Sequence, residues 1–266
     1  MKIGEKFGEL KKKKEGALIA YICAGDPTPE KTKEYVEALV RGGADIVELG
    51  LPFSDPVADG PTIQAGLERA LNGGMTPDIY FETAGSLSVN TPLVVMTYYN
   101  LIFRRGLEKF VKDCVSSGIS SIIVPDLPAE ESGELAAFCK KHGVDLIFLV
   151  APTTTESRMK RILAQGTGFI YLVARLGVTG ARADVAGSTR ELIKRVKTTT
   201  PKAVGFGISN GKQAAEIMRA GADGVIVGSA FVDIIASGNN AAERLEALAR
   251  ELKEGIRAAR GSKFLR

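Results

Sequence analysis

The chain has 266 residues, of which 45% are hydrophobic and 25% are charged, and its formal net charge at pH 7 is +4. These values are typical of a globular protein that can bury a substantial core. The one dense basic run, Lys11–Lys14, fits a solvated helix end better than a nucleic-acid surface. No apolar run reaches the ~18 residues of a membrane helix, and the first residues lack the apolar region of a signal peptide. We therefore expect a cytoplasmic protein that binds neither nucleic acid nor a membrane.

Short apolar runs alternate with helical patterns along the chain. Five of the runs follow a glycine that suits the left-handed end of a helix, namely Gly43, Gly118, Gly143, Gly168 and Gly221. The length and branched content of the runs predict strands buried on both faces, at 18–24, 44–51, 92–98, 119–124, 144–150, 169–173, 203–208 and 224–227. The patterns between them predict helices near 29–42, 62–72, 106–117, 129–142, 156–165, 188–199, 210–220 and 241–258.

Strict alternation of strand and helix predicts an α/β fold with an all-parallel sheet, and eight such units favour a single closed (β/α)₈ TIM barrel over residues 1–266. An open doubly wound sheet is the competing fold, but no Gly-x-Gly-x-x-Gly follows the first strand. Ile3, Phe7 and Leu10 form the apolar face of an extra N-terminal helix, which can plug the N-terminal mouth of the barrel. Residues 75–90 predict an extra helix after the second unit.

The stretch Glu48-Leu-Gly-Leu-Pro-Phe-Ser-Asp55-Pro-Val-Ala-Asp59-Gly-Pro61 places a carboxylate inside an apolar strand and two more in the loop after it. Alternation along the strand puts Val47 and Leu49 on one face and Glu48 on the other, so Glu48 points into a core if the first face meets helices. A buried carboxylate protonates, finds a partner or takes part in chemistry. Glu48 and Asp59 therefore suggest paired proton-transfer chemistry. The alternative is a structural ion pair with turn residues beside it.

In a (β/α)₈ barrel the active site forms at the carboxyl ends of the strands. The seventh and eighth strands run into Gly205-Phe-Gly207-Ile-Ser209 and Gly228-Ser229-Ala230. These glycines let backbone N–H groups approach a phosphate, and a short helix beginning at Ser229 would direct its positive end toward it. The alternative is that the glycines only permit tight turns. A glycine-containing loop from Leu176 to about Gly187, which includes Thr179-Gly180, is expected to be mobile and to close over the site.

Cysteine and histidine are not expected to take part in the chemistry. Cys23, Cys114 and Cys139 are far apart in the sequence and fit small buried hydrophobic residues in a reducing compartment. The only histidine, His142, stands at an apparent helix end before Gly143. A histidine-ligated zinc site and histidine acid–base catalysis are therefore not expected.

Residues 47–64 read Val-Glu-Leu-Gly-x-Pro-Phe-Ser-Asp-Pro-x-Ala-Asp-Gly-Pro-x-Ile-Gln, which resembles the signature of the tryptophan synthase alpha subunit family. The resemblance extends to about residue 258. It implies a lyase of tryptophan biosynthesis that splits indole-3-glycerol phosphate into indole and glyceraldehyde 3-phosphate by retro-aldol cleavage. It also implies no cofactor in this chain. The expected partner is a beta subunit that holds pyridoxal phosphate, in a heterotetramer of two alpha and two beta chains, and Leu51–Pro56 is the expected contact.

The resemblance also implies roles for single residues. Glu48 matches the proton-shuttling carboxylate, Asp59 the carboxylate that faces the indole N–H, and Tyr171 a tyrosine of the catalytic site. The remaining matches are substrate-binding positions: Tyr21, Met96 and Tyr98 around the indole, Thr179 and Gly180 in the closing loop, and Phe206, Gly207, Gly228 and Ser229 at the phosphate. Tyr21 and Met96 stand where phenylalanine and leucine are expected, and both keep the pocket apolar.

Two other functions stay open at this point. Another phosphate-binding barrel, an isomerase or synthase, would share the last two strands but would often use a catalytic lysine on a strand, and no lysine lies within the predicted strand cores. A barrel that has lost activity and only activates its partner would be free to lose Glu48, Asp59 or Tyr171, and all three are present.

Overall fold

The computed structural model describes residues 1–173, 182–205 and 207–261. Within them, nine parallel strands are ordered β5-β4-β3-β2-β1-β9-β8-β7-β6. The strands are β1 Ala17–Cys23, β2 Ile46–Gly50, β3 Leu93–Met96, β4 Ile119–Ile123, β5 Asp145–Ile147, β6 Leu149–Val150, β7 Ile170–Val173, β8 Lys202–Gly205 and β9 Gly224–Val227. The two ends of this order, β5 and β6, are separated in the chain only by Phe148. The sheet is therefore a nearly closed barrel of eight strand positions, as predicted.

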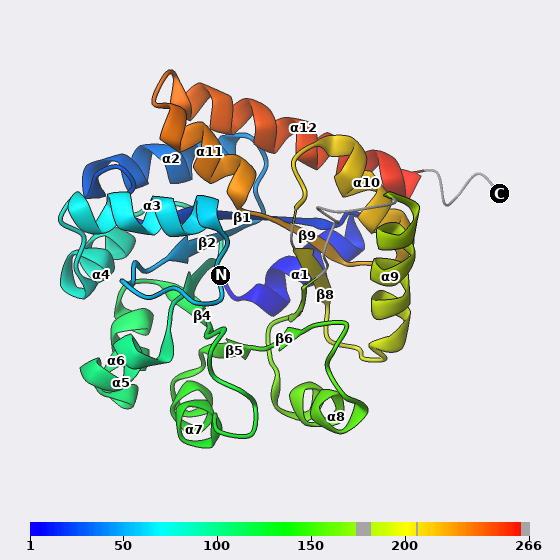
Figure 1. The fold of residues 1–266 in the computed structure, drawn as a ribbon, viewed down its shortest axis with the longest axis horizontal. Coiled ribbons are helices and arrows are strands. Elements are labelled where there is room, and N and C mark those ends of the chain that lie inside the picture. The colour runs from blue at the N-terminus through cyan, green and yellow to red at the C-terminus, as the bar shows by residue number, and fades with distance from the viewer. Residues whose placement is uncertain (174–181, 206, 262–266) are drawn as a thin grey trace.

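Helices surround the strands (Figure 1). In the described residues they are α2 Pro29–Arg41, α3 Pro61–Asn72, α4 Pro77–Gly85, α5 Tyr99–Arg105, α6 Leu107–Ser116, α7 Gly133–His142, α8 Glu156–Gln165, α9 Arg182–Arg195, α10 Gly211–Ala220, α11 Ser229–Ser237 and α12 Ala241–Gly261. The extra helix after the second unit is confirmed as α4. None of the helices in this part of the chain is both long enough and apolar enough to span a bilayer.

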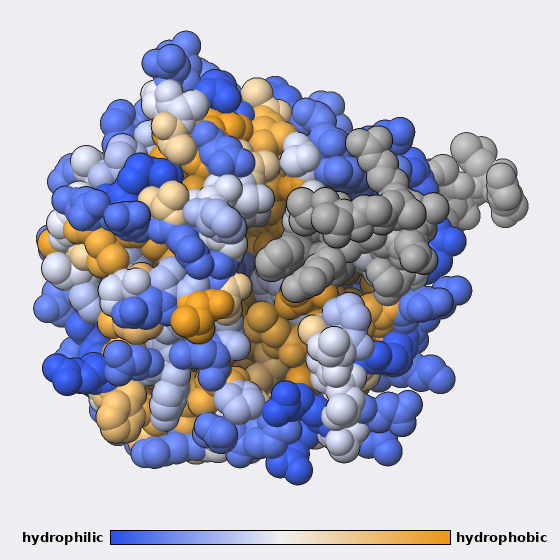
Figure 2. All heavy atoms as spheres, viewed as in Figure 1, coloured by the Kyte–Doolittle hydropathy of each residue, from blue (hydrophilic) through white to orange (hydrophobic). Residues whose placement is uncertain are grey.

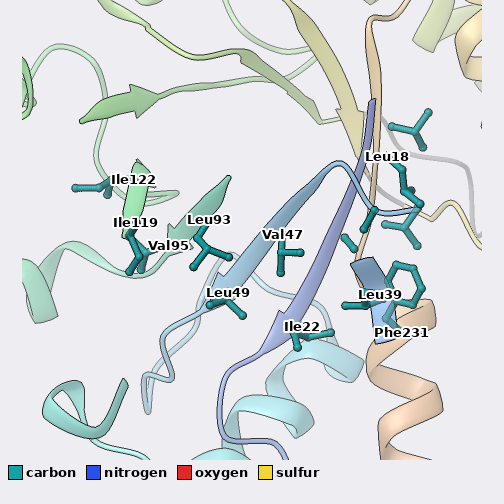
Figure 3. Close-up of a cluster of buried hydrophobic side chains, with 14 of the residues drawn as sticks. Leu18, Ile22, Leu39, Val47, Leu49, Leu93, Val95, Ile119, Ile122 and Phe231 are labelled. Carbon is teal, nitrogen blue, oxygen red and sulfur yellow. The ribbon is translucent and has the colours of Figure 1, made fainter. Parts of the chain in front are cut away.

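Alternation along each strand separates two cores. Outward residues such as Leu18, Val47 and Val95 pack against the helices, including Leu39 of α2 and Phe231 of α11 (Figure 3). The inward residues at the N-terminal end of the strands form a second, smaller cluster of which Ile19, Ile46, Val94 and Phe169 are members. Since both faces are apolar, only the carboxyl ends of the strands are left for polar chemistry.

The N-terminal helix α1, Ile3–Lys12, closes the inner core. Ile3, Phe7 and Leu10 are buried in the inner cluster, and the Phe7 and Phe169 rings lie 6.1 Å apart. This confirms that the apolar face predicted from the sequence covers the N-terminal mouth of the barrel.

Some sequence predictions were wrong in detail. The fifth predicted strand is interrupted at Phe148, and α5 was not predicted at all. Residues 182–187, expected to belong to a mobile loop, are the first turns of α9, and the rest of that loop, from 176 to 181, lies outside the described residues. Strand β8 begins at Lys202, one residue before its predicted start, and the Lys202 Nζ donates to the carbonyls of Ile193 and Val196 at 3.0 and 3.3 Å, away from the barrel interior.

The predicted burial of the cysteines and the predicted place of His142 at a helix end are confirmed. Cys23, Cys114 and Cys139 are free and buried. His142 is the last residue of α7, and Gly143 after it has a left-handed conformation.

Candidate active site

Strand β2 turns Glu48 into the barrel, because Val47 and Leu49 pack outward against the helices. Glu48 is 1% exposed, and none of the residues that the structure describes forms a hydrogen bond with its Oε2. Burial raises the pKa of Glu48 to about 8, and the nearby charge of Asp59 acts in the same direction. Glu48 therefore holds its proton near neutral pH and can donate it as a general acid.

Asp59 lies in the loop between β2 and α3, where Tyr98 holds it. The Tyr98 hydroxyl donates to Asp59 Oδ2 at 2.7 Å and accepts from the Ala58 N–H at 3.1 Å. The Tyr98 ring also stacks on Phe53, with the ring centroids 5.4 Å apart. Burial raises the pKa of Asp59, while the Tyr98 hydrogen bond opposes that shift. Tyr98 occupies only one of the two carboxylate oxygens.

Tyr21 on β1 and Tyr171 on β7 form the walls above the inner core, and each lies over a glycine of the next strand. A Cβ on Gly50 of β2 would overlap the Tyr21 hydroxyl, and a Cβ on Gly205 of β8 would overlap that of Tyr171. Burial raises the pKa of both tyrosines, so their hydroxyls stay neutral. The sequence analysis missed the role of these glycines as space for the rings.

Met96, at the end of β3, is half-buried and contacts two clusters. It packs against the inner core and also against the small cluster of Tyr21, Cys23, Leu67 and Val232 beneath α3 and α11. This places an apolar side chain beside the tyrosine walls. Apolar side chains also gather near the centre of the face seen in Figure 2, within a largely polar surface.

The ends of β8 and β9 bring the described part of the predicted phosphate site to the same mouth. The two strands are paired neighbours, Gly207 has φ of 73°, and Gly228 is the N-cap of α11, whose first residue is Ser229. The Gly228 carbonyl already accepts from Phe231 and Val232 at 2.8 and 3.1 Å. The first N–H groups of a helix have no partner within it, so those of Ser229 and Ala230 are suited to an anion. Thr179, Gly180 and Phe206 lie outside the described residues.

A cavity of about 430 Å³ lies beside this mouth. It is lined by the segment after β4, by the interrupted fifth strand and by α8, with Val124, Asp126, Phe148 and Ile162 among the residues. It lies at the break in the ring, where β5 pairs with β4 and β6 pairs with β7 among the described strands. Within the described residues, no group of three or more His, Cys, Asp or Glu side chains is placed to hold a metal ion.

Comparison with known proteins decides the family. The sequence profile of the family described as "Tryptophan synthase alpha chain" matches residues 7–258. The chain belongs to the tryptophan synthase alpha chain family. It is 66% identical over 258 residues to the tryptophan synthase alpha chain of Methanosarcina acetivorans, covering 97% of this chain and 95% of that one. It is 54% identical over 240 residues to that of Methanocaldococcus jannaschii, covering 88% and 85%.

Solved structures agree with the family and the fold. The tryptophan synthase subunit alpha of Legionella pneumophila superimposes with a TM-score of 0.88 at 32% identity, covering 96% of this chain and 98% of that chain. A chain of the tryptophan synthase complex of Pyrococcus furiosus gives 0.82 at 38% identity, covering 90% and 98%. The family match and the structural match thus cover the same barrel, over nearly the whole chain.

Proposed function

We propose that this chain cleaves indole-3-glycerol phosphate to indole and glyceraldehyde 3-phosphate, with Glu48 as proton shuttle and Asp59 as the partner of the indole nitrogen. The observation that carries the proposal is a buried Glu48 whose Oε2 has no hydrogen-bond partner among the described residues. Glu48 is protonated near neutral pH and is close enough to Asp59 to respond to its charge. The family relationship supplies the reaction.

The proton balance of the cleavage fits one shuttling carboxyl group. Glu48 gives its proton to carbon 3 of the indole, and Asp59 stabilises the positive charge that develops on the indole nitrogen. Glu48 then takes the proton of the side-chain hydroxyl. The oxygen electrons form the aldehyde carbonyl, the carbon–carbon bond breaks, and its electrons restore the indole. Glu48 ends protonated, ready for the next turnover.

The remaining residues bind and orient the substrate. Tyr21, Met96, Tyr98 and Tyr171 hold the flat indole in an apolar environment in which charges interact strongly. Gly207, Gly228 and Ser229 hold the phosphate through backbone N–H groups and the positive end of α11. Thr179, Gly180 and Phe206 complete this binding site in our proposal.

The test is a spectrophotometric assay of indole release from indole-3-glycerol phosphate by the purified chain. Release of indole in stoichiometric amounts with glyceraldehyde 3-phosphate supports the proposal. An isomerase or synthase of another phosphate substrate would release no indole. An inactive barrel would release none either, but would still activate a beta subunit added to it.

The partner is proposed to be the beta subunit of tryptophan synthase, which would hold the pyridoxal phosphate, in a cytoplasmic complex of two alpha and two beta chains. The contact expected at Leu51–Pro56 needs adjustment, because Leu51 and Pro52 are buried. Val57 is 81% exposed and is the apolar residue that this loop offers to a partner. Size-exclusion chromatography of the chain mixed with a beta subunit tests this partnership.

A further inference from the structure

Helix α3 packs along one face against the end of β1 and the turn that follows it. Ile63 accepts a hydrogen bond from the Cys23 thiol at 3.8 Å, and one turn later a Cβ on Gly66 would come within 2.9 Å of the Cys23 sulfur. At the end of the helix, a Cβ on Gly73 would overlap the carbonyl of Pro27. Ile63, Gly66 and Gly73 are three and seven residues apart, and this spacing places them on one face of an α-helix. The helix therefore has almost no freedom to shift on the turn.

An ion pair at the centre of this face joins Arg69 of α3 to Asp26 of the turn. The Arg69 Nε donates to Asp26 Oδ1 at 2.8 Å and its terminal nitrogen donates to Oδ2 at 2.7 Å. Asp26 is 0% exposed, and burial raises its pKa against the opposing effect of Arg69. Burying such a pair contributes little net stability, but its two parallel hydrogen bonds fix distance and direction.

The position of α3 matters because Asp59 lies two residues before its first residue, Pro61. The first turn of the helix is bonded to the segment that carries Asp59: the Gln64 side-chain amide donates to the Asp59 carbonyl at 2.9 Å, and the Gln64 backbone donates to Gly60 at 3.0 Å. On the other side, Tyr98 holds the Asp59 carboxylate. Asp59 is thus supported from two directions, by Tyr98 and by α3.

We propose that Asp26 and Arg69 are positioning residues for the cleavage reaction: their ion pair fixes α3, and through α3 the place of Asp59 relative to Glu48. This inference rests on the role proposed for Asp59. Neither residue contacts the reacting atoms. Loss of their two parallel hydrogen bonds would slow the reaction because it would displace the Asp59 carboxylate, which contacts the substrate in the proposed mechanism.

Arg69→Lys tests the proposal, because lysine keeps the charge and loses the planar fork. We expect kcat to fall by about 10- to 100-fold, since a displacement of about 1 Å at a reacting group has an effect of this order. KM should change little, because the apolar walls and the phosphate site are untouched. The matched control is Arg41→Lys, which alters the single Arg41 Nε to Glu246 contact of 2.9 Å between α2 and α12 and should leave kcat unchanged. An unchanged kcat in folded Arg69→Lys overturns the proposal.

A double-mutant cycle with Asp59→Asn separates positioning from general destabilisation. If Arg69 acts through Asp59, Arg69→Lys slows the parent enzyme but has no further effect on the Asp59→Asn enzyme. Equal slowing in both backgrounds overturns the proposal. If Asp59→Asn alone is fully active, it is the proposed role of Asp59 that fails, and the cycle reports this separately. Asp26→Asn removes the fully buried carboxylate and leaves without its partner only the Arg69 guanidinium, which is one-third exposed. It therefore replaces Arg69→Lys in the cycle if that variant does not fold.

Discussion

A carboxyl group in water loses its proton near pH 4, at about the reference value for glutamate. Glu48 keeps its proton to about pH 8, because burial and the charge of Asp59 both oppose ionisation. Glu48 is buried inside the barrel because its neighbours on β2, Val47 and Leu49, point outward to the helices. One side chain therefore becomes both a proton donor and a proton acceptor at neutral pH.

Glu48→Gln should lower turnover by ~10²–10⁴-fold, because the amide has nearly the same shape but cannot shuttle a proton. Thermal denaturation should show a folded protein. The matched control is Glu68→Gln on the exposed side of α3, which should keep the parent rate. A Glu48→Gln enzyme with more than a tenth of the parent rate would give Glu48 a structural role only.

Asp59→Asn should lower the pKa of Glu48, because it removes the second of the two causes of the shift. The pKa should stay above the ordinary glutamate value, since burial is the larger cause. Carbon-13 NMR titration of labelled glutamate carboxyls measures this directly. The same variant should lower turnover by ~10²–10³-fold through lost stabilisation of the indole nitrogen. A Glu48 pKa that does not move would place Asp59 too far away for its proposed role.

At the scale of elements, periodicity in the sequence was enough for the strands, because strands buried on both faces are continuous apolar runs. It could not show α5, whose first N–H is capped by Asp126 from 27 residues away at 2.9 Å. It misread the beginning of α9, where Gly187 inside a helix was taken as part of a loop. In the site, Glu48 and Asp59 were visible as unusual carboxylates, whereas the Asp26–Arg69 pair joins residues 43 positions apart and leaves no local pattern.

Helix α11 should bind phosphate through its first turn, and occupancy should raise the melting temperature by mass action. Gly228→Val should remove this effect. A Cβ at this position lies 3.3 Å from the Tyr21 ring, so the larger side chain must extend toward the place of the anion or displace the ring. Gly133→Val, at the start of α7 with open space around its Cβ, is the matched control. Differential scanning fluorimetry with glycerol phosphate measures the response, and an unchanged shift in folded Gly228→Val moves the phosphate site elsewhere.

The contact of α12 with α10 should be intolerant of a single methyl group. A Cβ on Gly255 would overlap the backbone carbonyl of Gly211, which cannot move as a side chain can. We expect Gly255→Ala to lower the free energy of unfolding by about 1–3 kcal/mol. Gly8→Ala on α1, where nothing lies within 4 Å of the added Cβ, should instead raise it by about 0.5–1 kcal/mol. Urea denaturation of both variants measures the two changes in the free energy of unfolding. A Gly255→Ala protein as stable as the parent would show that the close approach of Gly255 to Gly211 is not needed.

For the whole molecule, the pKa of Glu48 makes folding depend on pH. At Glu48, the folded chain keeps a proton that the unfolded chain has lost, between the ordinary value of 4.5 and about 8. Stability is therefore lost as pH rises through this window, by at most about 1.4 kcal/mol per pH unit. Glu48→Gln should remove this part of the slope, so the variant gains stability over the parent as pH rises toward 8. Denaturation at several pH values measures the difference, and parallel curves would show that Glu48 ionises in the folded chain as it does in water.

The pairing of β1 with β9 has a consequence for how the protein is made. Ala17–Ala20 of β1 pair with Gly224–Val227 of β9, which are synthesised about 200 residues later. Until then one edge of the growing sheet has unpaired N–H and C=O groups, which are open to pairing with other chains. The β1–β9 ladder can therefore form only after about 200 further residues have been made, and the exposed edge of β1 is a site for aggregation until then.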